Sequence, residues 1–211
     1  MRGLTVGVLM SGGIDSAVVL QLLLRRGRRV QPVYVRCGLR WEPAEMWWLR
    51  RYLRAVRTPR LLPLRVLEAP VASLYGAHWS LTGRGVPSAR SADAAVYLPG
   101  RNLLLLSAAA IVCAQQGIST IALGTLGGNP FGDATPEFFS RMAAALSRAL
   151  NRPMCILAPL RGKSKSAWVR AARQLPLRLT FSCLNPSGHQ PCGRCNKCAE
   201  RSRALRQAGV R

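Results

Sequence analysis

Two kinds of apolar segment alternate along the chain. Short apolar runs bounded by turn residues are typical of buried strands. They lie at residues 4–10, 30–36, 61–67, 119–124 and 154–158. Longer segments carry apolar residues at the spacing of one helix face, at residues 14–26, 43–57, 101–116, 136–150 and 164–174. This alternation predicts an α/β fold in which a parallel, five-stranded, doubly wound sheet is covered by helices on both faces.

Two stretches depart from this alternation. Residues 68–96 mix glycine, serine and proline with short apolar pieces, so we assign no regular structure to them and expect a flap beside the active site. From Thr180 the chain becomes rich in cysteine, proline and glycine, and a short helix is expected from Ala199 to Gln207. We therefore expect a main domain, residues 1–178, and a small C-terminal segment, residues 179–211.

The longest apolar run, residues 103–114, is interrupted only by Ser107. It holds about eleven apolar residues, fewer than the roughly twenty that a membrane-spanning helix needs. The first residues predict a strand and lack the long apolar region of a secretory signal peptide. A chain of 211 residues can bury a core of its own. We expect a cytoplasmic protein with no membrane partner.

The chain is strongly basic, with 31 lysine and arginine residues against 8 aspartate and glutamate residues and a net charge of +23. Such a charge favours anionic partners, of which polyphosphates and RNA are the obvious ones. All but three of the basic residues are arginines, and alanine, leucine, glycine and proline are abundant as well. A compositional bias therefore explains the charge equally well, and both interpretations stay open.

The segment SGGIDS, residues 11–16, joins the first predicted strand to the first predicted helix. Glycines let backbone N–H groups approach an anion, and the positive end of the helix adds to the attraction. Asp15 would repel a phosphate unless a cation lay between them, which indicates Mg²⁺; the alternative is a tight turn that Asp15 caps. The segment lacks the lysine of an ordinary P-loop, so the balancing charge has to come from elsewhere in the chain.

Four cysteines gather in the C-terminal segment with CxxCxxC spacing at its end. They are Cys183, Cys192, Cys195 and Cys198. Four thiolates fill a tetrahedral coordination sphere, so we predict a closed, structural Zn²⁺ site; an iron–sulfur cluster is the alternative. His189 lies inside the loop and is expected to be a turn residue. Cys37, Cys113 and Cys155 lie on or beside apolar elements and are expected to be buried small hydrophobes.

Four polar residues stand near the starts of two predicted helices. Arg101 and Asn102 open a helix that is otherwise apolar, and an arginine there can bind a phosphate or a carboxylate with its planar guanidinium. Asp133 and Glu137 carry carboxylates that can accept hydrogen bonds from a ligand. The alternatives are a solvated arginine and two helix-capping carboxylates.

The order of these motifs resembles a known family. SGGxDS directly after the first strand resembles the signature of the PP-loop, or N-type, ATP pyrophosphatases, and within them the chain is most similar to the 7-cyano-7-deazaguanine synthase (QueC) family. Further matching segments follow in order: VYLPGRNLLLLSAAA at 96–110, FGDATPEFF at 131–139, PLRGKSK at 159–165 and LTFSCLNPSGHQPCGRCNKC at 179–198. The resemblance covers nearly the whole chain, from Leu9 to Arg201.

The resemblance implies ATP cleavage between the α and β phosphates. The enzyme would adenylate 7-carboxy-7-deazaguanine, form the amide with ammonia and, with a second ATP, dehydrate it to the nitrile. The residues implied to bind ATP are Leu9, Met10, Ser11, Gly12, Gly13, Ile14, Asp15, Ser16 and Lys165. Those implied to bind the deazapurine are Arg101, Asn102, Asp133 and Glu137, and those implied to be catalytic are Lys165, Asp15 and Arg101. Lys165 would supply the charge that the glycine turn lacks, whereas Lys163 does not match the motif and is expected at the surface.

The sequence departs from the family's pattern in two places. The segment 124–138 is shorter than usual and carries Gly132 where a proline is common, and residues 35–41 keep only Gly38 and Arg40 of the family's motif. Three alternatives therefore stay open. They are a QueC-like enzyme that transfers the activated deazaguanine to a protein amine, a PP-loop enzyme that modifies tRNA, and a zinc-stabilised binding module without activity. A homodimer stays open as the oligomeric state.

Overall fold

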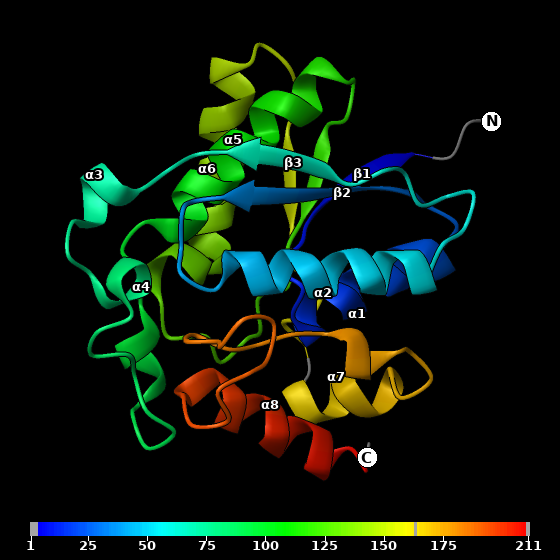
Figure 1. Ribbon diagram of the computed structural model, residues 1–211. Helices are drawn as coiled ribbons and strands as arrows, with labels where there is room; N and C mark the ends of the chain where they lie inside the picture. The colour runs from blue at the N-terminus through cyan, green and yellow to red at the C-terminus, as the bar shows by residue number, and fades with distance from the viewer. Residues whose placement is uncertain (1–3, 163, 210–211) are drawn as a thin grey trace.

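The protein, described as a computed structural model over residues 4–162 and 164–209, is built on one parallel sheet (Figure 1). The strands are β1 (Thr5–Leu9), β2 (Arg29–Arg36), β3 (Arg65–Glu68), β4 (Thr120–Ala122) and β5 (Cys155–Leu157). They pair side by side in the order β3-β2-β1-β4-β5, all parallel. The predicted five-stranded parallel sheet is therefore confirmed.

Helices cover both faces of the sheet. The longer ones are α1 (Ile14–Arg25), α2 (Glu42–Ala55), α5 (Arg101–Gln115), α6 (Pro136–Ala149), α7 (Lys165–Ala171) and α8 (Asn196–Gln207). Successive residues of β2 point to opposite faces: Val33 and Val35 pack in the core with α5 and α6, while Tyr34 packs in the core with α1 and α7. The sheet is thus doubly wound, as the alternation of apolar segments predicts.

The predicted third strand, residues 61–67, is only partly formed. Leu61 makes an isolated bridge to Val30, and the ladder resumes at Arg65. Between them lies Pro63, which has no backbone N–H to donate to a ladder. Its carbonyl instead accepts a hydrogen bond of 2.6 Å from the side chain of Gln31. The strand is shortened because the proline interrupts the pairing.

Residues 68–96 contain more structure than their composition predicts. They form two one-turn helices, α3 (Ala72–Tyr75) and α4 (Trp79–Thr82), and the 3₁₀ turn η1 (Asp93–Val96). The segment is attached to the cysteine-rich tail: Asn196 donates its backbone N–H to Pro87, and the Asn196 side chain donates to Ser91 and Asp93. The composition of this segment assigned no regular structure to it, because contacts with distant residues, and not local sequence, order it.

The cysteine-rich tail lies against the glycine turn that follows β1. The backbone N–H of Phe181 donates to the carbonyl of Gly12 over 2.7 Å. Helix α8 begins at Asn196, earlier than the predicted Ala199, because Cys195 already takes the extended conformation of an N-cap residue. Lys163 and the chain ends, with parts of both predicted domains, lie outside the described residues. The boundary between residues 178 and 179 stays a prediction.

Within the residues that the structure describes, every helix falls short of the length and apolar character that crossing a membrane requires.

Candidate active site

A cavity of about 290 Å³ opens at the carboxyl ends of β1 and β4. The strand order reverses between these two strands, and ligands of open parallel sheets bind at such a point. Of the predicted ATP and substrate residues, the lining includes Leu9, Met10, Ser11, Gly13, Ile14, Asp15, Ser16, Arg101, Asn102 and Lys165. The fold therefore brings three separate motifs of the sequence to one cavity.

The glycine turn has a backbone that tolerates no side chain at its centre. Gly12 has a φ of +70°, and a Cβ placed there would lie 3.2 Å from the carbonyl oxygen of Glu45. The Ser16 hydroxyl holds the turn closed, because it donates to the Gly13 carbonyl over 3.0 Å and accepts from the Ser11 backbone N–H over 3.3 Å. The N-cap residue of α1 is Gly13 and not Asp15, and the Asp15 carboxylate accepts a hydrogen bond from another partner.

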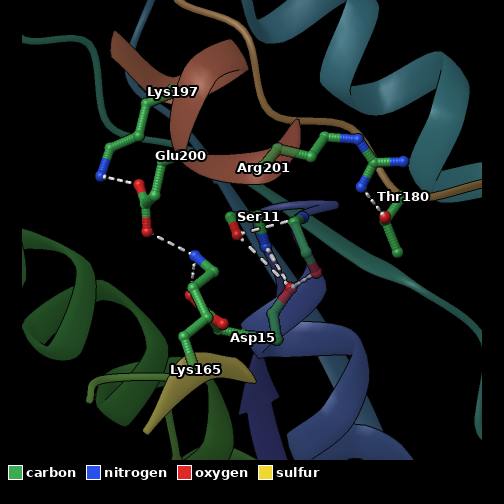
Figure 2. Close-up of polar contacts among 9 residues, drawn as sticks. Ser11, Asp15, Lys165, Thr180, Lys197, Glu200 and Arg201 are labelled. Carbon is green, nitrogen blue, oxygen red and sulfur yellow. Dashed lines mark hydrogen bonds and ion pairs between the residues drawn. The ribbon is translucent and has the colours of Figure 1, made fainter. Parts of the chain in front are cut away.

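That partner is Lys165, the first residue of α7 (Figure 2). Its Nζ lies 3.0 Å from Oδ2 of Asp15 and 2.5 Å from Oε1 of Glu200. Burial alone would lower the pKa of Lys165, but the two carboxylates outweigh it and raise that pKa. Burial would likewise raise the pKa of Glu200, but Lys165 and Lys197 lower it to about 2. The structure thus brings a lysine to the glycine turn from a distant part of the sequence.

Arg101, at the start of α5, lies on another wall of the cavity. Its guanidinium carbon is 5.8 Å from the ring centroid of Trp41, within cation–π range. Its buried Nε has no hydrogen-bond partner, and neither does the buried hydroxyl of Thr125. Both residues line the cavity. Unpaired buried polar atoms are costly, so these two groups fit a cavity that receives a polar, anionic ligand.

The other predicted substrate residues are engaged with the protein itself. Asp133 accepts hydrogen bonds from the backbone N–H of Asn102, over 2.9 Å, and from its side chain. It therefore caps α5, whereas α6 is capped by Thr135. Glu137 forms an exposed ion pair with Arg141. Neither Asp133 nor Glu137 lines the cavity, so their assignment to substrate stays a prediction.

Glu45 lines the cavity and is buried. Its Oε2 accepts a hydrogen bond of 2.8 Å from the hydroxyl of Tyr34. Burial raises the pKa of Glu45 to about 8, although the charge of Arg101 and the hydrogen bond from Tyr34 both lower it. Glu45 is therefore protonated at neutral pH, and the positive charge of Arg101 is not cancelled by it.

This protonation predicts a pH-dependent stability. The folded protein keeps the Glu45 proton up to pH about 8, whereas an unfolded glutamate releases it near pH 4.5. The folded state binds more protons in this window, so its free energy of unfolding falls as the pH rises, by on the order of 1 kcal/mol per unit. Glu45→Gln keeps an acceptor for Tyr34 and removes this loss.

Urea unfolding at pH 5 and pH 8 measures the effect as the difference between the variant and the wild type. The variant should be the more stable of the two at pH 8 and should lose that advantage at pH 5. Glu137→Gln is the control, since the Glu137 side chain is 72% exposed. A wild type and a Glu45→Gln variant with parallel pH profiles would contradict the protonated carboxyl.

The four predicted cysteine ligands lie together beside the cavity. Their sulfur atoms are all within 4.8 Å of one another. Tetrahedral coordination with Zn–S distances of about 2.3 Å places the sulfurs about 3.8 Å apart, so the cluster fits one Zn²⁺ ion. Backbone N–H groups of Cys192 and Leu184 donate to the sulfurs of Cys183 and Cys195, over 3.2 and 3.3 Å. Such donors stabilise bound thiolates. An iron–sulfur cluster, the alternative, holds several iron and sulfide atoms between its cysteine ligands and therefore needs the cysteine sulfurs farther apart than one Zn²⁺ ion does.

The remaining cysteines divide into two kinds. Cys37 and Cys113 are buried, and burial raises the pKa of each thiol to about 11, which makes them poor nucleophiles at neutral pH. Cys155 is exposed, contrary to expectation, because β5 is the edge strand of the sheet. His189 lies outside the cysteine cluster and stacks on Trp47 with ring centroids 4.7 Å apart.

A second cavity, of about 430 Å³, adjoins the first. The residues common to both linings are Asp15, Gly124, Lys165, Lys197 and Glu200. Its other walls come from the loop that carries Pro130 and Phe131 and from Arg203 of α8. The ring of Phe131 stacks on Tyr97 with centroids 4.8 Å apart. The cavity thus combines an aromatic wall with charged side chains of both signs, since Asp93 also lines it.

The sequence-based reasoning missed several residues of these cavities. Thr125 follows shortly after the end of β4, at the edge where parallel sheets bind ligands, and this position could have identified it. Lys197 and Glu200 lie between and just after predicted metal ligands. Their role in the cavity wall depends on how α8 docks, for which the sequence carries no local signal.

Comparison with known families and proteins agrees with the motifs. The family model of the queuosine biosynthesis protein QueC matches residues 5–209. The chain is 32% identical to 7-cyano-7-deazaguanine synthase 1 of Desulfitobacterium hafniense, over 95% of this chain and 90% of that protein. It is also 32% identical to the 7-cyano-7-deazaguanine synthase of Anaeromyxobacter dehalogenans, over 96% of this chain and 92% of that protein.

Solved structures support the fold alone, because their identities to this chain are low. A predicted subunit of a tRNA methyltransferase from Methanocaldococcus jannaschii is 15% identical, with a TM-score of 0.54 over 98% of this chain and 89% of that one. A 4-thiouridine synthetase, solved with RNA and bound ATP, is 18% identical, with a TM-score of 0.54 over 97% of this chain and 50% of that one.

Proposed function

The chain belongs to the QueC family of queuosine biosynthesis proteins, and from this premise we propose that it is an ATP-dependent 7-cyano-7-deazaguanine synthase. The observation that carries the proposal is the meeting of the glycine turn, Lys165 and Arg101 in one cavity at the switch point of the sheet. A nucleotide phosphate, a cation to balance it and a second anion-binding group are what adenylation of a carboxylate requires.

ATP is proposed to bind in the first cavity with its phosphates on the glycine turn. The carboxylate oxygen of 7-carboxy-7-deazaguanine attacks the α-phosphorus, the bond from phosphorus to the oxygen of the β-phosphate breaks, and pyrophosphate leaves. Lys165 stabilises the charge that develops on the leaving group. An Mg²⁺ ion bound with ATP would neutralise further phosphate charge, and the Asp15 carboxylate at the turn is an oxygen ligand of the kind that this ion prefers.

The adenylate then reacts with ammonia. The ammonia nitrogen attacks the acyl carbon, AMP leaves, and the nitrogen releases a proton as the amide forms. A second ATP adenylates the amide oxygen, and loss of AMP and a proton gives the nitrile. Through both steps the protein has to hold the base beside the α-phosphate and exclude water, which would hydrolyse the adenylate. The apolar residues of the first cavity, among them Leu9, Trp41 and Phe181, suit this exclusion.

Product analysis tests this proposal directly. Purified protein with ATP, Mg²⁺, ammonia and 7-carboxy-7-deazaguanine should release AMP and pyrophosphate, without ADP, and form the amide and then the nitrile. Reactions without the base are the control for uncoupled hydrolysis. If AMP formed but ammonia were not incorporated, water would be hydrolysing the adenylate, and the natural acceptor would be a nucleophile other than ammonia. If no AMP formed, the proposed function would fail.

We propose that the second cavity holds the deazapurine, with its ring against Phe131. Stacking of a base on an aromatic side chain contributes about 1–3 kcal/mol, so Phe131→Ala should raise KM for the deazapurine by about five-fold or more and leave KM for ATP unchanged. Initial rates measured at varied deazapurine concentrations and at varied ATP concentrations give the two KM values separately. Phe138→Ala is the matched control, since Phe138 is partly buried and lines neither cavity. Equal rises in both KM values would contradict the placement.

A further inference from the structure

Two of the chain's three lysines meet at one carboxylate. Lys165 and Lys197 lie 2.5 and 2.7 Å from the two oxygens of Glu200, in a protein whose other basic side chains are 28 arginines and Lys163. Figure 2 shows the two ammonium groups approaching Glu200 from opposite sides, with Asp15 next to Lys165. These four side chains form a continuous ionic cluster between α7, α8 and the glycine turn.

The ionic cluster is the wall that separates the two cavities. All four of its residues line both of them. It holds two ammonium groups and two carboxylates, and its side chains are between 20% and 33% exposed. Lysine carries its charge as a compact group on a flexible stem, so each lysine can turn from Glu200 to a phosphate without moving its helix. The charge is therefore available to an anion in the first cavity.

The position of α8 is fixed from two sides. Cys195 and Cys198 of the cysteine cluster lie at its start, so Lys197 stands between two sulfur ligands and Glu200 follows one turn later. Arg201 donates to the Thr180 hydroxyl and to the carbonyl of Leu177, in the segment that also reaches the glycine turn. Lys197 and Glu200 are thus held at a defined place beside the cavity.

We propose that Lys197 is a second lysine that binds the phosphates of ATP and that Glu200 is the positioning residue of both lysines. The metal-bound tail would then contribute directly to the nucleotide site. The proposal rests on the proposed function only in that ATP is the ligand. Since it concerns binding of phosphates, it can be tested without the deazapurine, so its failure and a failure of the synthase reaction are distinguishable.

The competing explanation is that Lys197 and Glu200 form an ordinary ion pair on one helix. Such i,i+3 pairs add little to stability. The loss of this pair would therefore change the affinities for ATP, AMP and adenosine equally or leave all three unchanged. If Lys197 binds phosphates, its loss should weaken the binding of each ligand in proportion to the charge of that ligand's phosphates. The contrast between ATP and adenosine therefore separates the two explanations.

Lys197→Met keeps the aliphatic stem and removes the charge. Calorimetry should show ATP and inorganic pyrophosphate bound about ten-fold or more weakly, as expected for one lost charge-assisted hydrogen bond, with adenosine affinity unchanged. Arg206→Met is the matched control, since it removes one charge from an exposed position on the same helix. Glu200→Gln should weaken pyrophosphate binding, and Glu200→Asp should restore part of it. A Lys197→Met variant that binds pyrophosphate normally would overturn the proposal.

A measurement on the unaltered protein avoids the risk that a variant loses the metal. Amine-reactive labelling followed by mass spectrometry reads Lys165 and Lys197 separately, because the chain has three lysines. Pyrophosphate and ATP should protect Lys197 from labelling several-fold, and adenosine should not. Equal labelling of Lys197 with and without pyrophosphate, at concentrations where pyrophosphate binds, would overturn the proposal even if every variant misfolded.

Discussion

Replacing Lys165 by alanine is expected to lower the rate of AMP formation by about 10²–10³-fold, the size found when a preorganised electrostatic contact to a transition state is removed. The charge on the departing pyrophosphate would lose the lysine that the structure places at the glycine turn, 3.0 Å from Asp15. The fold should persist, because Glu200 keeps its second partner, Lys197. Quenched-flow or chromatographic measurement of AMP gives the rate.

Arg173→Ala is the matched control for Lys165→Ala. It removes one positive charge from an exposed position just after α7 and should leave the rate unchanged. Metal content and the unfolding temperature of Lys165→Ala report whether the tail stays folded. A folded Lys165→Ala variant that forms AMP at the wild-type rate would contradict the role of Lys165 in phosphate binding.

The glycine turn and Lys165 show what a sequence motif can predict. SGGIDS and PLRGKSK are separated by about 150 residues, as the positions of Asp15 and Lys165 show, yet the structure places these two side chains in one ion pair. The strand-turn-helix pattern predicts where the turn lies, and parallel strands carry the two motifs to the same edge of the sheet. The fold was therefore predictable from local patterns and their order, whereas the place of Lys165 at the glycine turn was predicted from the family resemblance.

Asp133 shows the limit of such reasoning. A carboxylate before a helix indicates either a ligand contact or a cap, and the sequence does not state which helix is capped. Asp133 caps α5, which precedes it in the chain, through Asn102. The same limit applies to residues 68–96, whose short helices are anchored by Asn196 in the tail. Contacts between segments so far apart depend on the packing of the whole molecule and leave no periodic signal in either segment.

Replacing Cys192 by serine is expected to release the metal and unfold the C-terminal tail. The tail holds few apolar side chains, so coordination supplies much of the free energy of its folding, and the loss should amount to several kcal/mol, on the order of what structural zinc sites contribute. Cys192 is the most exposed of the four cysteines, so serine costs little in packing. Metal analysis and hydrogen exchange of α8 measure the two effects.

The consequence should reach the nucleotide site. Phe181 donates to the carbonyl of Gly12, and α8 carries Glu200, the partner of Lys165, so an unfolded tail leaves the glycine turn and the lysine without support. ATP should raise the unfolding temperature of the wild type, and it should no longer raise that of Cys192→Ser. Cys155→Ser makes the same atomic change on the exposed edge of β5 and should alter neither property. Metal loss with an undiminished response to ATP would show that the tail and the nucleotide site are independent; retention of the metal by Cys192→Ser would overturn the four-cysteine site itself.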